Sequence, residues 1–136
     1  MADTDPDTVV REFLKAWEAR DLDSIMEYFD DNAEYENVPV PPLKGRADIR
    51  IFIGGILYAF KNIDVVIHQQ VSNGGIVMNE RTDTICAESG AQVPLRVMGI
   101  FEIRDGKIVK WSDYFDGTAL KKSVRSLVAG RSLAGL

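Results

Sequence analysis

Residues 92–115 read QVPLRVMGIFEIRDGKIVKWSDYF, and the pair Asp105-Gly106 divides this stretch into two strand-like runs. Asp-Gly between two alternating sequences is a strong signal for a β-hairpin. The odd positions of the first run are nearly all apolar: Val93, Leu95, Val97, Gly99, Phe101 and Ile103. Because alternate residues of a strand share a face, we expect the odd face of this run to point into the core.

Two more strand-like runs precede this hairpin. Turn signals at Asn73-Gly74-Gly75 and Glu88-Ser89-Gly90 separate them from their neighbours. The expected strands cover about 62–71, 76–86, 92–104 and 107–115. Short connections between successive strands predict an antiparallel meander.

Upstream of the meander, apolar residues recur at helical spacing. Asp5-Pro6 predicts the start of a first helix that runs to about Arg20. Asp21 is expected to cap a second helix, which ends in the polar turn Asp30-Asp31-Asn32. Residues 47–60 predict a third helix, weakened by two adjacent glycines. The three apolar stripes are Val9, Val10, Phe13, Leu14 and Trp17; Leu22, Ile25, Met26 and Phe29; and Ile49, Phe52, Ile53, Ile56, Leu57 and Phe60.

The segments between and after these elements are shorter. Ala33–Asn37 alternates, which predicts a strand or an extended arm, and the three prolines of Val38–Pro42 predict a stiff extended loop. Asp116 is placed to cap a final amphipathic piece, and the tail 129–136 is expected to be loose. The apolar positions of that piece are Leu120, Val124, Leu127 and Val128.

Helices followed by a meander of long strands predict one α+β domain over residues 1–136. In this architecture a curved antiparallel sheet carries the N-terminal and mid-chain helices on one face. We expect a cone-shaped molecule that encloses an internal pocket.

Composition excludes several classes of protein. The chain has 136 residues with 16 Lys and Arg against 21 Asp and Glu, so its net charge of −5 argues against nucleic-acid and membrane-surface partners. One cysteine, Cys86, and one histidine, His68, cannot supply a zinc-type ligand set, so no metal is expected. The start of the chain lacks the basic and apolar regions of a signal peptide, which predicts a cytoplasmic protein.

Charged residues interrupt two apolar strand faces. Arg81 and Asp83 follow Asn79 on the face of Val77 and Ile85, and Asp113 shares the face of Val109, Trp111 and Phe115. Burying such charges costs several kcal/mol unless they are paired. A bulged or edge register that turns them to solvent is the competing interpretation.

If Arg81, Asp83 and Asp113 lie together, their charges predict acid and base catalysis. Two carboxylates around one guanidinium total −1, and poor solvation favours keeping one carboxyl protonated. An acid and a base would then lie side by side and could activate water without a metal or cofactor.

Three motifs together resemble limonene-1,2-epoxide hydrolases. They are Tyr35-Glu36-Asn37-Val38-Pro39-Val40-Pro41-Pro42, Asn79-Glu80-Arg81-Thr82-Asp83 and Trp111-Ser112-Asp113-Tyr114-Phe115-Asp116. Cyclases and ketosteroid isomerases share the fold of this family, so two alternatives stay open. One is a proton-transferring isomerase or cyclase, and the other is a non-catalytic module that binds small molecules.

The resemblance implies one-step hydration of an epoxide to a vicinal diol, with no cofactor. Asp113 would take a proton from a water held by Tyr35 and Asn37. Asp83 would protonate the epoxide oxygen, and Arg81 would bridge the two carboxylates. The family likeness also implies a homodimer.

The substrate is expected to be a small hydrophobic epoxide in an apolar pocket. Trp111 is interpreted as a pocket wall or a core residue that could also position Asp113. Met78 and Met98 lie at even positions and are expected on the other sheet face or at an interface. The other candidate pocket residues are Met26, Phe52, Ile53, Leu57, Leu95 and Phe101.

Overall fold

A computed structural model of the chain describes residues 4–127. Its strands form one six-stranded sheet in the order β2-β1-β6-β5-β4-β3. The elements are α1 (Pro6–Ala16), the short 3-10 helix η1 (Trp17–Ala19), α2 (Leu22–Met26), β1 (Phe29–Val38), β2 (Leu43–Lys44), α3 (Arg46–Ala59), β3 (Asn62–Asn73), β4 (Ile76–Cys86), β5 (Gln92–Arg104), β6 (Lys107–Tyr114) and α4 (Gly117–Leu127).

The four long strands β3 to β6 form the antiparallel meander that the turn signals predict. Strand β1 pairs with β6 in parallel, which the local sequence does not indicate. In this register Tyr35 lies beside Trp111, and Asn37 lies beside Asp113. The pairing therefore brings the first and the last of the three motifs together.

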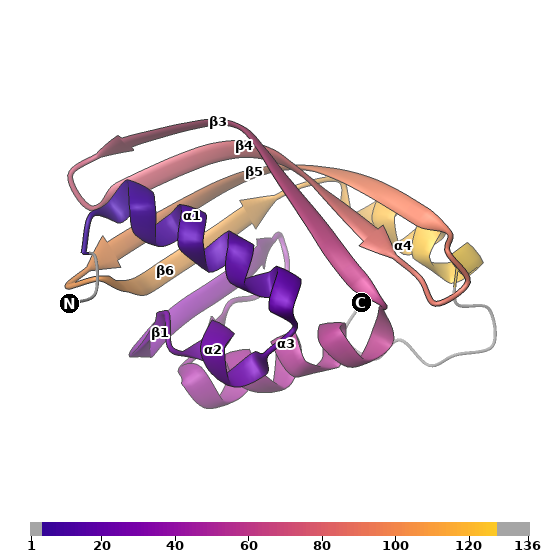
Figure 1. Cartoon of the computed structure of the whole chain (residues 1–136), viewed down its shortest axis with the longest axis horizontal. Helices are drawn as coiled ribbons and strands as arrows, with labels where there is room; N and C mark the ends of the chain where they lie inside the picture. Colours follow the sequence, from indigo (N-terminus) through magenta and orange to yellow (C-terminus); the bar gives the residue numbers. More distant parts are fainter. Residues whose placement is uncertain (1–3, 128–136) are drawn as a thin grey trace.

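The sheet curves over the helices, which lie on its concave side (Figure 1). Asp5 caps α1 by accepting from the backbone N–H of Thr8, and Asp21 caps α2 by accepting from Asp23 and Ser24, as predicted. The α+β class and its one-sided helical layer are thus confirmed. Within residues 4–127, no helix has the length and apolar character needed to cross a membrane.

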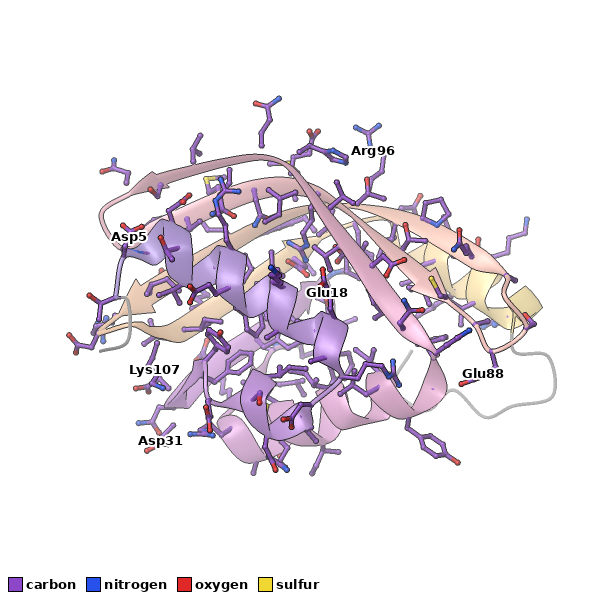
Figure 2. The ribbon with its side chains drawn as sticks, in the orientation of Figure 1. Asp5, Glu18, Asp31, Glu88, Arg96 and Lys107 are labelled. Atoms are coloured by element: carbon purple, nitrogen blue, oxygen red, sulfur yellow. The ribbon has the colours of Figure 1, made fainter. Side chains whose placement is uncertain are left out.

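Aromatic side chains hold the helical layer against the sheet. The Phe13 ring of α1 makes edge contacts with Phe29 at 5.3 Å and with Trp111 at 5.1 Å between ring centroids. Such pairs add to the free energy of apolar burial. Charged side chains such as Asp31, Arg96 and Lys107 project from the periphery (Figure 2), and the described buried residues are mostly apolar.

Of the two adjacent glycines in α3, Gly54 allows close packing against α2. A Cβ atom there would lie 3.3 Å from the Leu22 side chain of α2. Gly55, in contrast, has nothing within 4 Å of its Cβ position. Only the first glycine therefore serves helix packing.

The polar turn predicted at Asp30-Asp31-Asn32 is wrong, since these residues lie inside β1. Helix α2 ends at Met26, and Phe29 already pairs with Ile108 of β6. Asp30 Oδ2 accepts from the Asn32 backbone N–H at 3.0 Å, and the register with β6 shifts before Glu34. The turn-forming residues make a bulge within a strand, which requires the same local hydrogen bonding as a turn.

The stiff extended loop predicted for Val38–Pro42 is also wrong at its start. The Val40 N–H donates to the Asn37 carbonyl at 2.8 Å, across a cis peptide bond between Val38 and Pro39. This tight turn reverses the chain so that β2 pairs antiparallel to β1.

The prediction of which β6 residues face inward is wrong at the start of the strand. Ile108 is fully buried where Val109 was expected, because the register with β5 shifts between Glu102 and Ile103. Trp111 and Asp113 keep the predicted inward orientation.

The end of the chain follows the expected capping pattern. Asp116 Oδ1 accepts from the Ala119 backbone N–H at 2.9 Å at the start of α4. Leu120 and Val124 are buried against Phe60 and Ile85. Val128 and the tail 129–136 lie outside the described residues.

Candidate active site

The polar residues that interrupt the apolar faces are buried, so the solvent-facing alternative register is wrong. Arg81 is 1% exposed, Asn79 2% and Asp113 4%. Asp83 is the most accessible of the group, with a side chain 17% exposed. Strand parity therefore places all four on the inner face of the sheet, as the apolar pattern predicts.

The Arg81 guanidinium connects the other three side chains by hydrogen bonds. Its Nε–H donates to Asp83 Oδ1 at 3.0 Å, and its Nη2–H donates to Asp113 Oδ2 at 2.5 Å. Its Nη1–H donates to Asn79 Oδ1 at 3.0 Å. Each of the three guanidinium nitrogens thus has a partner, as a buried cation requires.

Trp111 holds the other oxygen of Asp113. Its indole Nε1–H donates to Asp113 Oδ1 at 2.7 Å, and its ring stacks on Tyr35 at 4.1 Å between centroids. Phe101 stacks on the opposite side at 5.2 Å. The sequence-based alternatives for Trp111 both apply, since it is a core residue and also a donor to Asp113.

Tyr35 and Asn37 lie on the same side of β1, next to Asp113. The Tyr35 hydroxyl donates to Asn37 Oδ1 at 3.3 Å. Burial, with the nearby Asp113 charge, raises the pKa of the phenol far above its usual value of 10, so Tyr35 stays a neutral hydrogen-bond donor. Asp113, Tyr35 and Asn37 therefore form one polar group between β1 and β6.

Burial sets the electrostatics of the two carboxyls. It raises the pKa of Asp113 and of Asp83 above the ordinary 3.8, while the Arg81 charge opposes the rise at both. Burial by itself lowers the pKa of Arg81, but the charges of Asp113 and Asp83 outweigh it and raise that pKa further, so the guanidinium stays charged. Burial and the repulsion between two carboxylates favour having one of the pair protonated, while the Arg81 charge favours keeping the other ionised.

The two carboxyls differ in their hydrogen bonds. Both oxygens of Asp113 accept, one from Trp111 and one from Arg81. Asp83 accepts from Arg81 Nε, at 3.0 Å to Oδ1 and 3.3 Å to Oδ2. Donors stabilise an ionised acid, so this asymmetry favours the carboxylate form at Asp113 and the protonated form at Asp83.

The candidate pocket residues fall into two groups. Met26, Ile53 and Phe101 are at most 1% exposed, so protein atoms already cover their surfaces. Phe52, Leu57 and Leu95 are only partly buried. The last three therefore have apolar surface available to a bound molecule.

Gly99 is a site residue that sequence reasoning missed. A Cβ atom at this position would lie 2.4 Å from Arg81 Nη1 and 2.8 Å from Asp113 Oδ1. The available signal was a glycine on the inward, otherwise apolar face of a long strand. Gln70 was also missed, and its contacts are described below.

The site does not contain a recognisable metal centre. Among the described residues, no group of three or more His, Cys, Asp or Glu side chains is placed to hold a metal ion. Cys86 is buried, and its thiol donates to Asp64 Oδ2 at 3.8 Å. Burial, with the Asp64 charge, raises the pKa of this thiol, so it is not an activated nucleophile.

Comparisons with known proteins agree with the geometry. The family model of the limonene-1,2-epoxide hydrolase catalytic domain matches residues 4–125. The epoxide hydrolase EphG of Mycobacterium tuberculosis is 30% identical over 138 aligned residues, which cover 95% of this chain and 91% of that protein.

Solved structures show the same fold. An M. tuberculosis epoxide hydrolase described as similar to this family superposes with a TM-score of 0.76 at 29% identity, covering 88% of this chain and 89% of the other. SalBIII, described as an epoxide hydrolase/cyclase-like enzyme in pyran ring formation, has a TM-score of 0.75 at 20% identity, covering 83% and 92%. The second likeness is informative about the fold alone.

Proposed function

The chain belongs to the limonene-1,2-epoxide hydrolase family, and from this premise we propose that it adds water to an epoxide in one step, by paired Asp acid and base catalysis. The observation that carries the proposal is the buried group in which Arg81 binds both Asp83 and Asp113. No cofactor takes part in the proposed reaction.

Asp113 is the proposed base. It accepts a proton from a water molecule that Tyr35 and Asn37 hold, and the water oxygen attacks an epoxide carbon. The parallel register of β1 and β6, which sets Asn37 beside Asp113, supports this assignment. A base with a raised pKa is well matched to proton abstraction near neutral pH.

Asp83 is the proposed acid. It donates its proton to the epoxide oxygen as the carbon–oxygen bond breaks, so the leaving oxygen becomes the second hydroxyl of the diol. Its greater exposure and its smaller set of donors support this role. One proton must then pass from Asp113 back to Asp83 before the next turnover, and Arg81 keeps its charge throughout.

A small hydrophobic epoxide is the proposed substrate. Asp83 pairs in register with Val65 of β3 and with Leu95 of β5, and both are only partly buried. Ile56 and Ile63 are also partly buried, and both pack against the main core around Phe13 and against the smaller cluster that contains Phe60 and Ile85. Apolar surface next to the acid is therefore available to the carbon skeleton of an epoxide.

The test is diol formation in oxygen-18 water across cyclic, terminal and bulky epoxides. We expect wild type to give labelled diol and Asp113→Asn to give almost none, although the variant stays folded by circular dichroism. An isomerised enone with no diol would instead favour the isomerase alternative. Binding of apolar ligands with no turnover would favour the binding module.

We also propose that the protein is a homodimer in the cytoplasm. The outer face of the sheet exposes apolar side chains that alternate with the buried ones, namely Val66, Val71, Met78, Met98 and Tyr114. Exposed apolar surface of this kind commonly marks an interface. Light scattering of wild type and of Met98→Lys tests it, since the variant should shift the protein toward monomer.

A further inference from the structure

A chain of side-chain hydrogen bonds runs from Arg81 to the first turn of α1. Arg81 Nη1–H donates to Asn79 Oδ1 at 3.0 Å, and Asn79 Nδ2–H donates to Gln70 Oε1, also at 3.0 Å. Gln70 Nε2–H donates in turn to the Asp7 carbonyl at 3.1 Å and to Asp7 Oδ1 at 2.9 Å. These hydrogen bonds thus link β4, β3 and α1.

The groups at the two ends of this series of hydrogen bonds determine how the side-chain amides of Asn79 and Gln70 are oriented. A guanidinium has donors only, whereas a carbonyl and an ionised carboxylate have acceptors only. Rotating either amide by half a turn would set donor against donor or acceptor against acceptor. Gln70 therefore holds Asn79 with its oxygen directed at Arg81.

Asp7 is suited to be the acceptor at the far end of this series of hydrogen bonds. The Gln70 hydrogen bond, followed by the one from Arg11, holds the pKa of the Asp7 carboxyl below its usual value. Its ionised form is therefore favoured, which keeps it an acceptor. The Arg11 Nε–H donates to Asp7 Oδ2 at 3.1 Å, so Oδ1 stays directed at Gln70.

Asn79 gives the guanidinium its third point of attachment. Asp83 binds Nε and Asp113 binds Nη2, and those two contacts alone would allow the plane of the group to tilt about the line that joins them. The Asn79 oxygen at Nη1 opposes the tilt and brings no further negative charge. An ionised aspartate in its place would add one negative charge to the group.

We propose that Gln70 is a positioning residue that acts through Asn79 to fix the Arg81 guanidinium between Asp83 and Asp113. Its effect on turnover rests on the proposed function, but its effect on Arg81 does not. Gln70 itself touches neither carboxyl of the acid and base pair in the described hydrogen bonds.

Kinetics of Gln70→Met give the first test, with Gln69→Met as the matched control. Gln69 is the neighbouring residue on β3 and is exposed, whereas Gln70 is partly buried. Losing a hydrogen bond that aligns a charged group should lower kcat about tenfold, with KM nearly unchanged. In an Asn79→Ala background, Gln70→Met should lower kcat no further, because its effect passes through Asn79.

Nuclear magnetic resonance of the arginine side chains gives a readout that does not need activity. In wild type and in Gln69→Met, we expect separate Nη–H signals for Arg81, since the bound guanidinium rotates slowly. In Gln70→Met these signals should average through faster rotation. If Gln70→Met does not fold, Gln70→Asn replaces it, because the amide is kept but is too short to reach both Asn79 and Asp7.

The outcomes are distinguishable. Faster rotation in Gln70→Met, in a protein whose wild type hydrates no epoxide, would support the positioning role and reject the proposed function. Unchanged Arg81 signals in Gln70→Met would overturn the positioning role, whatever happens to kcat. A kcat loss of equal size in Gln69→Met would overturn it as well.

Discussion

Gly99 and Arg81 lie so close across β5 and β4 that a Cβ atom on the glycine would be 2.4 Å from Arg81 Nη1. The two strands pair in register at this point, with Asn79 directly opposite Gly99. A long, charged side chain can lie flat against the sheet here only because its neighbour has no side chain. The glycine therefore determines where the guanidinium lies relative to Asp113.

Gly99→Ala should damage both stability and turnover. The added methyl group must displace Arg81 or Asp113, and overpacking of this kind typically costs about 1–3 kcal/mol of unfolding free energy. Because Asp113 is the proposed base and Arg81 binds both carboxyls, we expect kcat to fall by at least about tenfold. Urea unfolding and steady-state kinetics measure the two effects.

Gly55→Ala is the matched control for this substitution. Its Cβ has nothing within 4 Å and the residue is exposed on α3, so alanine should raise the unfolding free energy by about 0.5–1 kcal/mol with kcat unchanged. Normal turnover by Gly99→Ala would contradict the tight packing inferred around Arg81.

Trp111→Phe should separate hydrogen bonding from ring packing. Phenylalanine keeps a ring against Tyr35 but loses the Nε1–H that donates to Asp113 Oδ1 at 2.7 Å. That donor lowers the pKa of Asp113, so its loss should raise the pKa further and move the acid limb of the pH-rate profile to higher pH. We expect kcat to fall about tenfold.

Trp17→Phe controls for the same change elsewhere in the core. Trp17 is buried, and its Nε1 is without a hydrogen-bond partner among the described residues. Removing that unpaired donor should leave the pH-rate profile unchanged. Equal shifts in the two variants would reject a specific role for the Trp111 donor.

Part of this arrangement could be predicted from sequence and part could not. The inward face of β4 follows from its alternation, so Arg81 and Asp83 could be placed together without a structure. Asp30-Asp31-Asn32 misleads because bulges and turns use the same residue types. The parallel pairing of β1 with β6 has no local signal, since it depends on how the helices return the chain to the sheet.

The positioning residues are missed for a related reason. Gly99 matters through the absence of a side chain opposite Arg81, and Gln70 matters through partners on two other elements. Neither relation has a characteristic spacing in the sequence. Motifs reveal residues that carry charge, whereas the residues that hold those charges in place emerge only from tertiary contacts.

Stability should depend on pH through the buried carboxyls. Burial raises the pKa of Asp113 above its unfolded value near 3.8, although Arg81 opposes the rise. A carboxyl with a raised folded pKa binds more protons folded than unfolded, so its stabilising effect is complete below the unfolded pKa and is lost as the pH rises through the folded one. The unfolding free energy of wild type should thus fall relative to Asp113→Asn above about pH 4.

Urea unfolding from about pH 4 to about pH 8 checks this slope. Asp31→Asn removes a negative charge from an exposed side chain and serves as the control. It shows what the loss of one surface charge does by itself. Parallel curves for wild type and Asp113→Asn would mean that the Asp113 carboxyl ionises alike in the folded and unfolded chain.

Hydration should invert the attacked carbon without a covalent intermediate. Asp113 and Asp83 bind different nitrogens of one guanidinium, so water and proton would reach the epoxide from separate positions. Separated carboxyls have the same consequence in inverting glycosidases, where water attacks opposite the leaving oxygen. A cyclic epoxide should therefore give the trans diol, and a single turnover in oxygen-18 water should label the diol and leave both aspartates unlabelled by mass spectrometry. Label in Asp113 or Asp83 would mean that a carboxylate is the nucleophile, and a cis diol from the cyclic epoxide would mean that the attacked carbon is not inverted; either result would reject direct attack by water.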